Sequence, residues 1–160
     1  MEYIKLGDAC KFIRNGASIK QFENAGGYPI TRIETIANSN INLNKVGYAN
    51  IYDLGKYEDY ILNNGDILMS HINSEKHLGK SAIWNKSQEK IIHGMNLLCL
   101  RPKKELINPK YMNYYFNTVN FKRQLPKITK KSVNQASFSV SDLKNLEFKL
   151  IDKIILRLYN

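Results

Sequence analysis

The tripeptide Gly79-Lys80-Ser81 ends like a phosphate-binding loop, in which backbone amides and a lysine neutralise nucleotide phosphates at a helix N-terminus. Such a loop also needs a glycine five residues before Gly79, where this chain has Ser74, and a helix directly after it. The residues that follow, Ser81 to Trp84, are instead typical of a strand. We therefore do not expect nucleotide hydrolysis.

A second pattern, Glu147-Phe148-Lys149, has the carboxylate-x-lysine spacing of many metal-dependent nucleases. Those enzymes need a further aspartate on a neighbouring strand to complete a Mg²⁺ site. The nearest candidate, Asp142, lies only five residues upstream of Glu147, which leaves no room for the hairpin that usually separates the ligands. The solvated face of a strand explains the pattern better.

The histidines and cysteines do not form a catalytic or metal-binding pattern either. None of His71, His77 and His93 has a second ligand three or four residues away, and no acidic residue stands where a catalytic triad needs one. Cys10 and Cys99 lie among apolar neighbours, which favours buried free thiols over a disulfide or a metal pair. The sequence also lacks a glycine-rich cofactor loop after its first strand. We expect no catalytic residues, no metal and no cofactor.

One segment does have the chemistry of a binding surface. Between Asn120 and Gln135 stand five cationic residues and no acidic one: Lys122, Arg123, Lys127, Lys130 and Lys131. Asn134, Gln135 and Ser137 follow at once. Lysines contact phosphates, while amides and hydroxyls pair with base edges, so this composition suits the recognition of a DNA sequence. A loop that is merely soluble is the alternative.

The excess of positive charge, +10 overall, is concentrated late in the chain. Residues 1 to 60 carry seven basic and seven acidic residues, whereas residues 101 to 160 carry 13 basic and four acidic ones. An AT-rich genome would also favour lysine, and the chain has 19 Lys against five Arg, but codon bias would raise lysine throughout. The clustering favours a polyanionic partner. Nucleic acid is preferred over a membrane surface, because no amphipathic helix carries the cations opposite an apolar face.

Short apolar runs separated by turn residues predict strands through the first hundred residues. These runs are Ala9 to Ile13, Tyr28 to Ile36, Ile67 to Ile72, Ser81 to Trp84 and Ile91 to Leu100. Residues 108 to 125 predict one amphipathic helix, with Asn108 as N-cap, Pro109 at the first helical position and an apolar stripe that includes Val119. Residues 126 to 135 follow no period.

Ser141 to Leu150 predicts a short capped turn that leads into a strand at Leu146 to Leu150, and a second helix is expected near Asp152. The expected fold class is α/β (α+β): a strongly twisted, mainly antiparallel β-sheet with flanking helices, in one domain.

Six segments follow one another in a distinctive order. They are KLGDACKFIRNG (5 to 16), GYPITRIETI (27 to 36), GDILMSHINSEKHLGKSAIW (65 to 84), IIHGMNLLCLRP (91 to 102), NPKYMNYYFNTVNF (108 to 121) and SVNQASFSVSDLKNLEFKL (132 to 150). Their order and spacing resemble those of the target recognition domain of a type I restriction-modification specificity (S) subunit.

The resemblance implies that residues 1 to 150 form a DNA target recognition domain, which reads one half-site of a bipartite double-stranded DNA target and is non-catalytic. Residues 151 to 160 would begin a truncated spacer helix with an apolar stripe at Ile154, Ile155 and Leu158. The implied partners are the methyltransferase (modification) and restriction subunits of the complex, and a second half-specificity chain. The competing interpretation is a protein-interaction module or truncated decoy that pairs with an intact specificity subunit. With no leader or membrane-spanning run, we expect a cytoplasmic location.

The predicted DNA-facing surface joins two loops, residues 70 to 80 and 122 to 137, with lysines positioning the duplex and polar side chains near the bases. Its members are Arg32, Ser70, Ser74, Lys76, Lys80, Lys122, Lys127, Lys130, Lys131, Asn134, Gln135 and Ser137. Ser74, Asn134, Gln135 and Ser137 are expected nearest the bases. Arg32 suits a guanine edge or a phosphate, and equally an ion pair with Glu34.

Overall fold

The computed structural model describes residues 2–86 and 88–150 of the chain. The helix expected near Asp152 lies outside these residues. The fold is mixed α+β, and its named strands pair antiparallel throughout, which confirms the expected class. The strands of the described residues form four separate sheets, however, where one was expected. None of the described helices has the length and apolar character that a membrane crossing needs.

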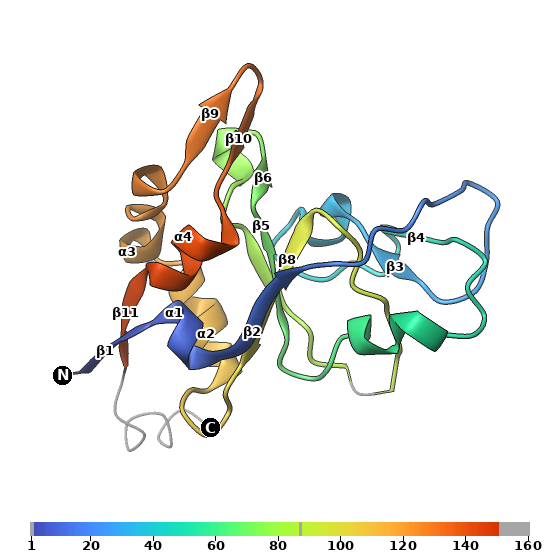
Figure 1. Ribbon diagram of the computed structural model, residues 1–160, viewed down its shortest axis with the longest axis horizontal. Coiled ribbons are helices and arrows are strands. Elements are labelled where there is room, and N and C mark those ends of the chain that lie inside the picture. The colour runs from blue at the N-terminus through green and yellow to red at the C-terminus, as the bar shows by residue number, and fades with distance from the viewer. Residues whose placement is uncertain (1, 87, 151–160) are drawn as a thin grey trace.

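A four-stranded sheet forms the centre of the molecule (Figure 1), in the order β2 (Cys10–Asn15), β8 (Leu97–Pro102), β5 (Ile67–Ser70) and β7 (Ser81–Ile83). Ile67, Met69 and Leu100 contribute to one hydrophobic cluster, whereas Leu68 and Cys99 contribute to another. Successive strand residues point to opposite faces, so both faces of the sheet are buried. This explains why β5 and β8 are continuous apolar runs instead of alternating ones.

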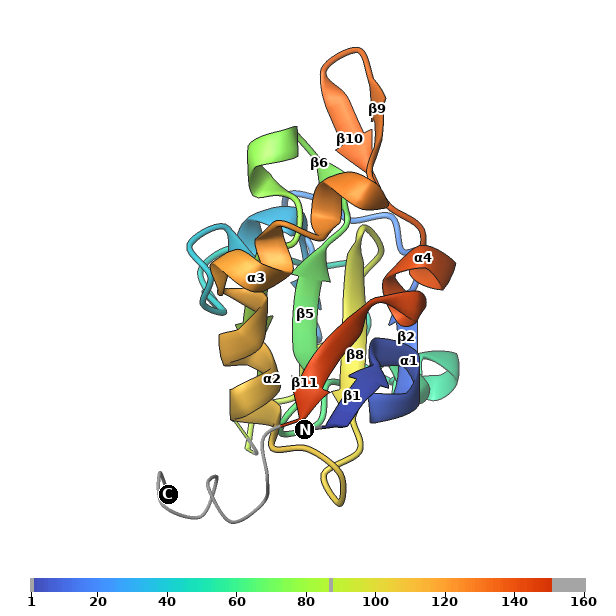
Figure 2. The same cartoon turned by 90° about the vertical axis from the view of Figure 1, so that its left-hand side faces the viewer.

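A helical layer covers one face of the central sheet. Figure 2 views the molecule from the side of this layer, with helices to the left of β5 and to the right of β8 and, between them, the antiparallel pair of β1 (Glu2–Lys5) and β11 (Glu147–Leu150). Its helices are α1 (Leu6–Ala9), α2 (Pro109–Phe116), α3 (Val119–Lys122) and α4 (Val140–Asn145). Met112, Phe116, Phe121 and Leu143 from these helices are fully buried in the first cluster. The predicted capped turn and strand of residues 141 to 150 correspond to α4 and β11.

The single helix predicted over residues 108 to 125 is wrong, because the chain breaks after α2. Asn108 caps α2 as expected, accepting a hydrogen bond from the Lys110 amide at 2.8 Å. Asn117 then ends α2, and the Thr118 hydroxyl accepts from the Phe121 amide at 3.3 Å to begin α3. The new helix has a different direction, so Val119 is 61% exposed instead of lying on the apolar stripe.

A three-stranded sheet projects from the body beyond the helical layer. It contains β6 (Ile72–Asn73), β10 (Gln135–Ser137) and β9 (Lys130–Ser132), and it is preceded by the short 3₁₀ turn η4 (Leu125–Lys127). We call the β9–β10 hairpin the ribbon; it forms the uppermost part of the molecule in both ribbon diagrams (Figures 1 and 2). Residues 126 to 135, which follow no period in the sequence, thus include part of η4, the strand β9 and the start of β10.

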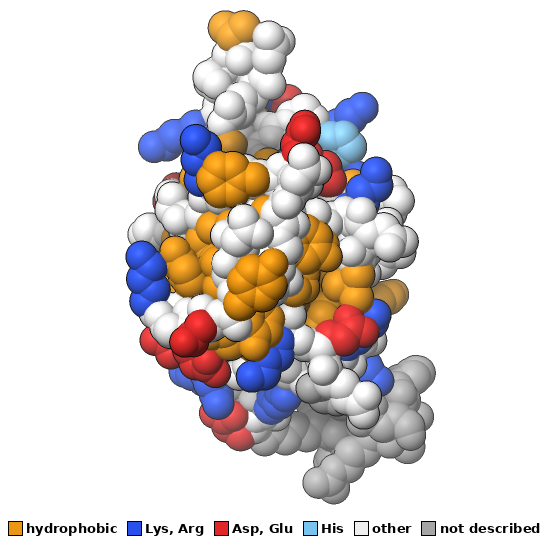
Figure 3. All heavy atoms as spheres, turned by 90° about the vertical axis from the view of Figure 1, so that its right-hand side faces the viewer, with side chains coloured by type: hydrophobic (Ala, Val, Ile, Leu, Met, Phe, Trp, Pro, Cys, Tyr) orange, Lys and Arg blue, Asp and Glu red, His pale blue; other side chains and the backbone are white. Residues whose placement is uncertain are grey.

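A second lobe, which we call the distal lobe, comprises residues 17–31 and 46–62 and lies on the right of Figure 1. It contains β3 (Ile30–Thr31), β4 (Val46–Gly47) and the 3₁₀ helix η2 (Gly55–Tyr60). Its small core is centred on Ile30 and Leu54, which pack with Ile92 from the segment before β8. Hydrophobic side chains also gather on its outer face (Figure 3), where Phe22 and Tyr52 are more than half exposed.

Two strand predictions fail where the distal lobe meets the central sheet. The strand predicted at Tyr28 to Ile36 ends at Thr31, because the Thr35 hydroxyl accepts from the Arg32 amide and donates to the Lys45 carbonyl, which folds the 3₁₀ helix η1 (Ile33–Ile36). The strand predicted at Ile91 to Leu100 begins only at Leu97, since the residues before it form isolated bridges to the lobe.

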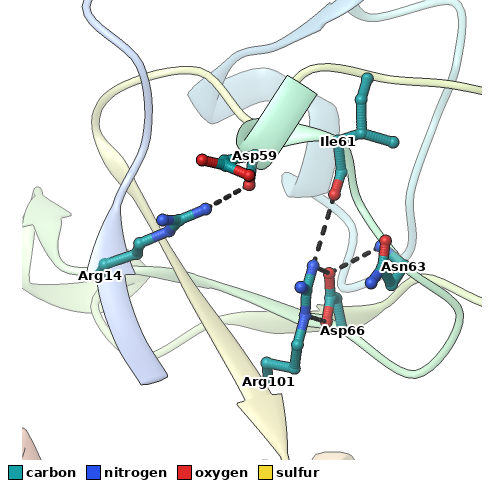
Figure 4. A network of polar contacts seen from close by, with 6 residues as sticks. All are labelled: Arg14, Asp59, Ile61, Asn63, Asp66 and Arg101. Carbon is teal, nitrogen blue, oxygen red and sulfur yellow. Dashed lines mark hydrogen bonds and ion pairs between the residues drawn. The ribbon is translucent and has the colours of Figure 1, made fainter. Parts of the chain in front are cut away.

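A buried ion pair lies at the junction of the lobe and the sheet (Figure 4). Arg101 donates to both carboxylate oxygens of Asp66, at 2.8 and 2.7 Å, and to the Ile61 carbonyl at 3.4 Å. Asp66 also accepts from the Asn63 amide at 2.7 Å and is only 1% exposed. Arg14 donates nearby to the Asp59 carbonyl. These bonds satisfy a buried carboxylate and fix the lobe to the sheet.

Candidate nucleic-acid interface

A cationic cleft of about 270 Å³ lies where the helical layer, η1 and the 3₁₀ helix η3 (Glu75–His77) meet. Three lysines line it, Lys76, Lys80 and Lys122, and Glu75 is its one acidic lining residue within the described part of the chain. The rest of the lining is made of the polar residues Ser39, Asn117 and Thr129 and of Leu78, Gly79, Leu125 and Pro126. The cleft therefore combines positive charge with polar groups, which is the chemistry of a phosphate-binding surface.

Gly79 and Lys80, in the turn between η3 and β7, line the cleft. Gly79 adopts a positive φ of 73°, and its amide donates to the Ser70 carbonyl at 2.8 Å. This positive φ favours glycine, and a side chain here would also push against the end of the Leu125 side chain. The next residue, Lys80, donates from Nζ to the Ala37 carbonyl at 2.7 Å, which ties the turn to the end of η1.

The ribbon beside the cleft presents one polar face. Directly paired residues of an antiparallel hairpin point to the same side, and successive residues alternate. The register pairs Lys130 with Ser137 and Ser132 with Gln135, so these four residues share a face. Ala136 points the opposite way and is buried against the body.

Lys131 lies on the same side of the ribbon as Ala136. Its Nζ is 2.8 Å from Glu75 Oε1, and both side chains are more than half exposed. The ion pair connects the ribbon to η3 and so places it next to the cleft. We call the cleft and the ribbon together the cationic end, comprising residues 70–80 and 117–139.

The structure brings most of the predicted site residues to the cationic end. The lysines Lys76, Lys122, Lys127 and Lys130 are exposed there, as are Asn134 and Gln135, while Ser74 and Ser137 are partly accessible. Asn134 also has a structural role, because its φ of 63° lies in the left-handed region that Asn tolerates in a tight turn.

Two predicted residues are placed differently. Ser70 is 2% exposed at the end of β5, so its side chain is not accessible to a duplex in this structure; sequence position suggested a loop, but the strand buries it. Arg32 does not line the cleft, and its Nε lies 3.7 Å from Glu34 Oε2 in an exposed ion pair. Of the two roles suggested by the sequence, contact with DNA and an ion pair with Glu34, the structure shows the ion pair.

The histidines and cysteines are buried or isolated rather than gathered. Burial lowers the pKa of His93 to about 4, and its Nε2 lies 2.6 Å from the Leu97 carbonyl oxygen. Burial raises the pKa of the Cys10 thiol to about 12 and that of Cys99 well above its usual value, so both are free, unreactive thiols as expected. Within residues 2–86 and 88–150, no three His, Cys, Asp or Glu residues come together in a way that could hold a metal ion.

Residues 1–152 match the family of type I restriction modification DNA specificity domains. The chain belongs to this family. It is 45% identical over 152 residues to the protein named as the type I restriction enzyme MjaX specificity subunit of Methanocaldococcus jannaschii, a match that covers 93% of this chain and 35% of that relative. It is 24% identical over 135 residues to the type I restriction enzyme EcoKI specificity subunit of Escherichia coli, covering 83% and 29%. The chain thus spans about a third of the length of these curated relatives.

Solved structures share the fold of this specificity domain. A chain from a structure of type I restriction-modification complex assembly and conformational transition has a TM-score of 0.68 at 17% identity, covering 99% of this chain and 36% of that one. The S subunit of M. genitalium has a TM-score of 0.57 at 12% identity, with 91% and 33% covered. As a specificity domain, the chain belongs to the non-catalytic part of a type I system.

Four residues in or beside the cationic end of the specificity domain were not predicted from the sequence. Ser39, Asn117 and Thr129 line the cleft, and Val133 stands at the tip of the ribbon. Asn117 was not predicted because it was placed inside one continuous helix. Ser39 was not predicted because it lies far from the other cleft residues in the sequence. Asn134 was the one available signal for the ribbon, because Asn tolerates the positive φ of a tight turn, but Val133 before it made that signal weak.

Proposed function

We propose that this specificity domain recognises a short double-stranded DNA sequence with its cationic end, and that this sequence is one half-site of a bipartite target. The observation that carries the proposal is the joint placement of a three-lysine cleft and a projecting polar ribbon. A two-stranded β-ribbon fits the major groove of B-DNA, where base edges can be distinguished. Lysines beside it would contact the phosphates that border the groove.

The charge of the cationic end supports this role. Its residues include seven cations and one acid, Glu75. Lys76, Lys122, Lys127 and Lys130 are exposed and form no ion pair within the described residues. Binding of a duplex there would release several counterions, which gives affinity a steep dependence on salt.

Different residues of the cationic end have different proposed roles. The free lysines, of which Lys130 shares the polar face of the ribbon, position the duplex. Gln135 and Ser137 on that same face, with Ser74 and Asn134 close by, contact base edges; a carboxamide is suited to adenine. Lys131 and Lys80 are already bonded within the protein and act chiefly by holding the ribbon and the turn in place.

The partners of the whole assembly are also part of the proposal. The MjaX and EcoKI relatives are about three times as long and are named as specificity subunits of restriction enzymes. We infer that this domain acts in the cytoplasm with methyltransferase and restriction subunits, and with a second half-specificity unit that reads the other half-site. It directs these subunits to DNA and carries out no reaction.

The competing function is that of a protein-interaction module that pairs with an intact specificity subunit. The exposed aromatic side chains of the distal lobe, Phe22 and Tyr52, are the observation that favours it. Such a module would not need the cations of the ribbon. Its binding would depend weakly on salt, in contrast to that of a DNA reader.

Selection from a random DNA library tests the proposal. The purified chain is incubated with random duplexes, and the bound fraction is sequenced. We expect enriched duplexes that share a few adjacent base pairs, and we expect Gln135→Ala to relax the preference at one of them. Lys20→Ala on the distal lobe is the control and should leave the enriched sequence unchanged. Uniform, weak binding without an enriched sequence would reduce the function to nonspecific electrostatic attraction.

A further inference from the structure

Val133 exposes an apolar side chain that the fold does not need. It is 90% exposed, more than any other large hydrophobic side chain of the described residues. It takes the first position of the two-residue loop that joins β9 to β10, at the outermost point of the ribbon (Figures 1 and 2). Of the two loop residues only Asn134 has a positive φ, so the turn tolerates a valine at position 133 but does not call for one, since tight turns favour Gly, Asn, Asp or Ser. Neither the core nor the turn therefore explains a valine.

The ribbon holds this side chain in a defined place. Ala136 and Phe138 are each 3% exposed, so the strand that follows the loop is anchored in the main core. β10 also pairs with β6, and the Phe138 amide donates to the His71 carbonyl at 3.2 Å. The other strand, β9, pairs with β10 along its whole length, and its Lys131 lies 2.8 Å from Glu75 in an exposed ion pair. A side chain positioned by a rigid scaffold can discriminate between ligands that differ by a single group.

The surroundings of Val133 indicate the kind of ligand that it meets. Lys130, Lys131 and Ser132 precede it in exposed positions, and Asn134 and Gln135 follow it. An apolar protein pocket would have to desolvate these neighbouring cations at a cost, whereas a DNA groove lined by phosphates would attract them. The major groove offers one apolar group to a side chain, which is the C5-methyl group of thymine.

Given the proposed function, we propose that Val133 is a specificity-determining residue that contacts the methyl group of one thymine in the major groove. The contact requires a thymine at a fixed position of the half-site. Uracil differs from thymine only by this methyl group, so uracil at that position keeps every hydrogen bond and loses the apolar contact. One buried methyl group corresponds to a change of about fourfold in affinity.

The test uses the enriched duplex from the library selection and replaces each of its thymines, one at a time, by deoxyuridine. Dissociation constants are measured for the wild-type chain, for Val133→Ala and for the control Leu106→Ala, which shortens an exposed side chain outside the cationic end. We expect one position at which uracil weakens wild-type binding about fourfold. Val133→Ala should bind the unmodified duplex about fourfold more weakly and show no further loss with uracil at that position. Leu106→Ala should behave like the wild type.

The outcomes separate this inference from the proposed function. An enriched duplex that has no uracil-sensitive position, or one whose sensitivity survives Val133→Ala, overturns the role of Val133 and leaves DNA recognition intact. The absence of any enriched duplex overturns the proposed function and this inference with it. Because Val133 is almost fully exposed, Val133→Ala should fold normally, and a thermal melting curve checks this.

Discussion

The cationic end and the distal lobe differ in charge, in exposed side chains and in how each is attached to the central sheet. The cationic end has seven basic residues and one acidic residue, whereas the distal lobe has two basic residues and four acidic ones. The exposed surface of the lobe carries aromatic rings, with Lys20 Nζ 5.6 Å from the ring centre of Phe22 and Lys56 Nζ 5.2 Å from that of Tyr57. The two lysines of the lobe thus lie over aromatic rings and not beside a polar ribbon.

This difference shows that the total charge of +10 is a poor guide to where a polyanion binds, because the fold determines which cations lie close together. The cations of residues 70–80 and 117–139 come from separate parts of the sequence and meet at one end. The distal lobe repels a polyanion weakly, and the Asp66–Arg101 pair, whose Arg101 also donates to the Ile61 carbonyl of the lobe, affects stability. Changes at the two ends should therefore affect different measurements.

The largest effect is expected at the junction. Asp66→Ala removes a carboxylate that is 1% exposed and leaves Arg101 partly buried without its partner. The free energy of unfolding should fall by about 3 kcal/mol, as measured by urea denaturation. Glu34→Ala is the matched control, since it breaks the exposed pair with Arg32 and should cost less than about 1 kcal/mol. Equal losses in both variants would contradict the structural role of the junction.

Acid should destabilise the fold through His93. Because burial lowers the pKa of His93 from 6.5 to about 4, the unfolded chain binds a proton in this window that the folded chain does not. Stability is therefore present above the unfolded pKa and is lost as the pH falls, by about 2 kcal/mol between about pH 7 and about pH 5. His93→Gln should show a smaller loss over the same range in urea denaturation. An equal loss in wild type and variant would exclude His93 as its cause.

Lysines of the two ends should have different effects on DNA affinity. The double variant Lys122→Ala/Lys130→Ala should weaken binding to a duplex on the order of tenfold and reduce the slope of log affinity against log salt by about two. The matched double variant Lys20→Ala/Lys56→Ala on the distal lobe should change neither quantity. Fluorescence anisotropy over a salt series measures both. A similar loss in the two double variants would mean that only net charge matters.

The smallest effect is expected for the one acidic residue of the cationic end. Glu75→Gln removes a negative charge close to the proposed phosphate contacts, so DNA affinity should rise about threefold. Its exposed ion pair with Lys131 contributes little to stability, so the melting temperature should change little. Glu58→Gln on the distal lobe is the control and should leave affinity unchanged. A loss of affinity in Glu75→Gln would mean that holding the ribbon outweighs the added repulsion.

The elements that the sequence predicts well are those whose signals are local. The strands at Ile67 to Ile72 and Ser81 to Trp84 are apolar runs between turn residues, and both are present as β5 with β6, and as β7. The predicted helix fails because Thr118 can cap a new helix in the middle of a sequence that still has a helical period. The strand predicted at Tyr28 to Ile36 fails for a similar reason, since the bonds of Thr35 outweigh β propensity.

For the site, residue chemistry was predictable and accessibility was not. The lysines of residues 122–131 are recognisable because no acid lies among them, and they do remain exposed. Ser70 is buried because both faces of β5 are covered, which depends on the packing of helices that come 40 residues later. Ser39 lines the cleft two residues after Ala37, whose carbonyl accepts a hydrogen bond from Lys80. Contacts of this kind depend on tertiary structure and leave no local pattern.

The most direct test of DNA recognition by the cationic end is to map the bound duplex on the domain. Backbone amide signals of the isotopically labelled chain are followed by nuclear magnetic resonance during titration with the enriched duplex. We predict that the largest shifts fall in residues 72–76, 117–123 and 130–137, and that residues 46–62 of the distal lobe stay unchanged. Shifts centred on residues 46–62, with the ribbon unaffected, would contradict the account.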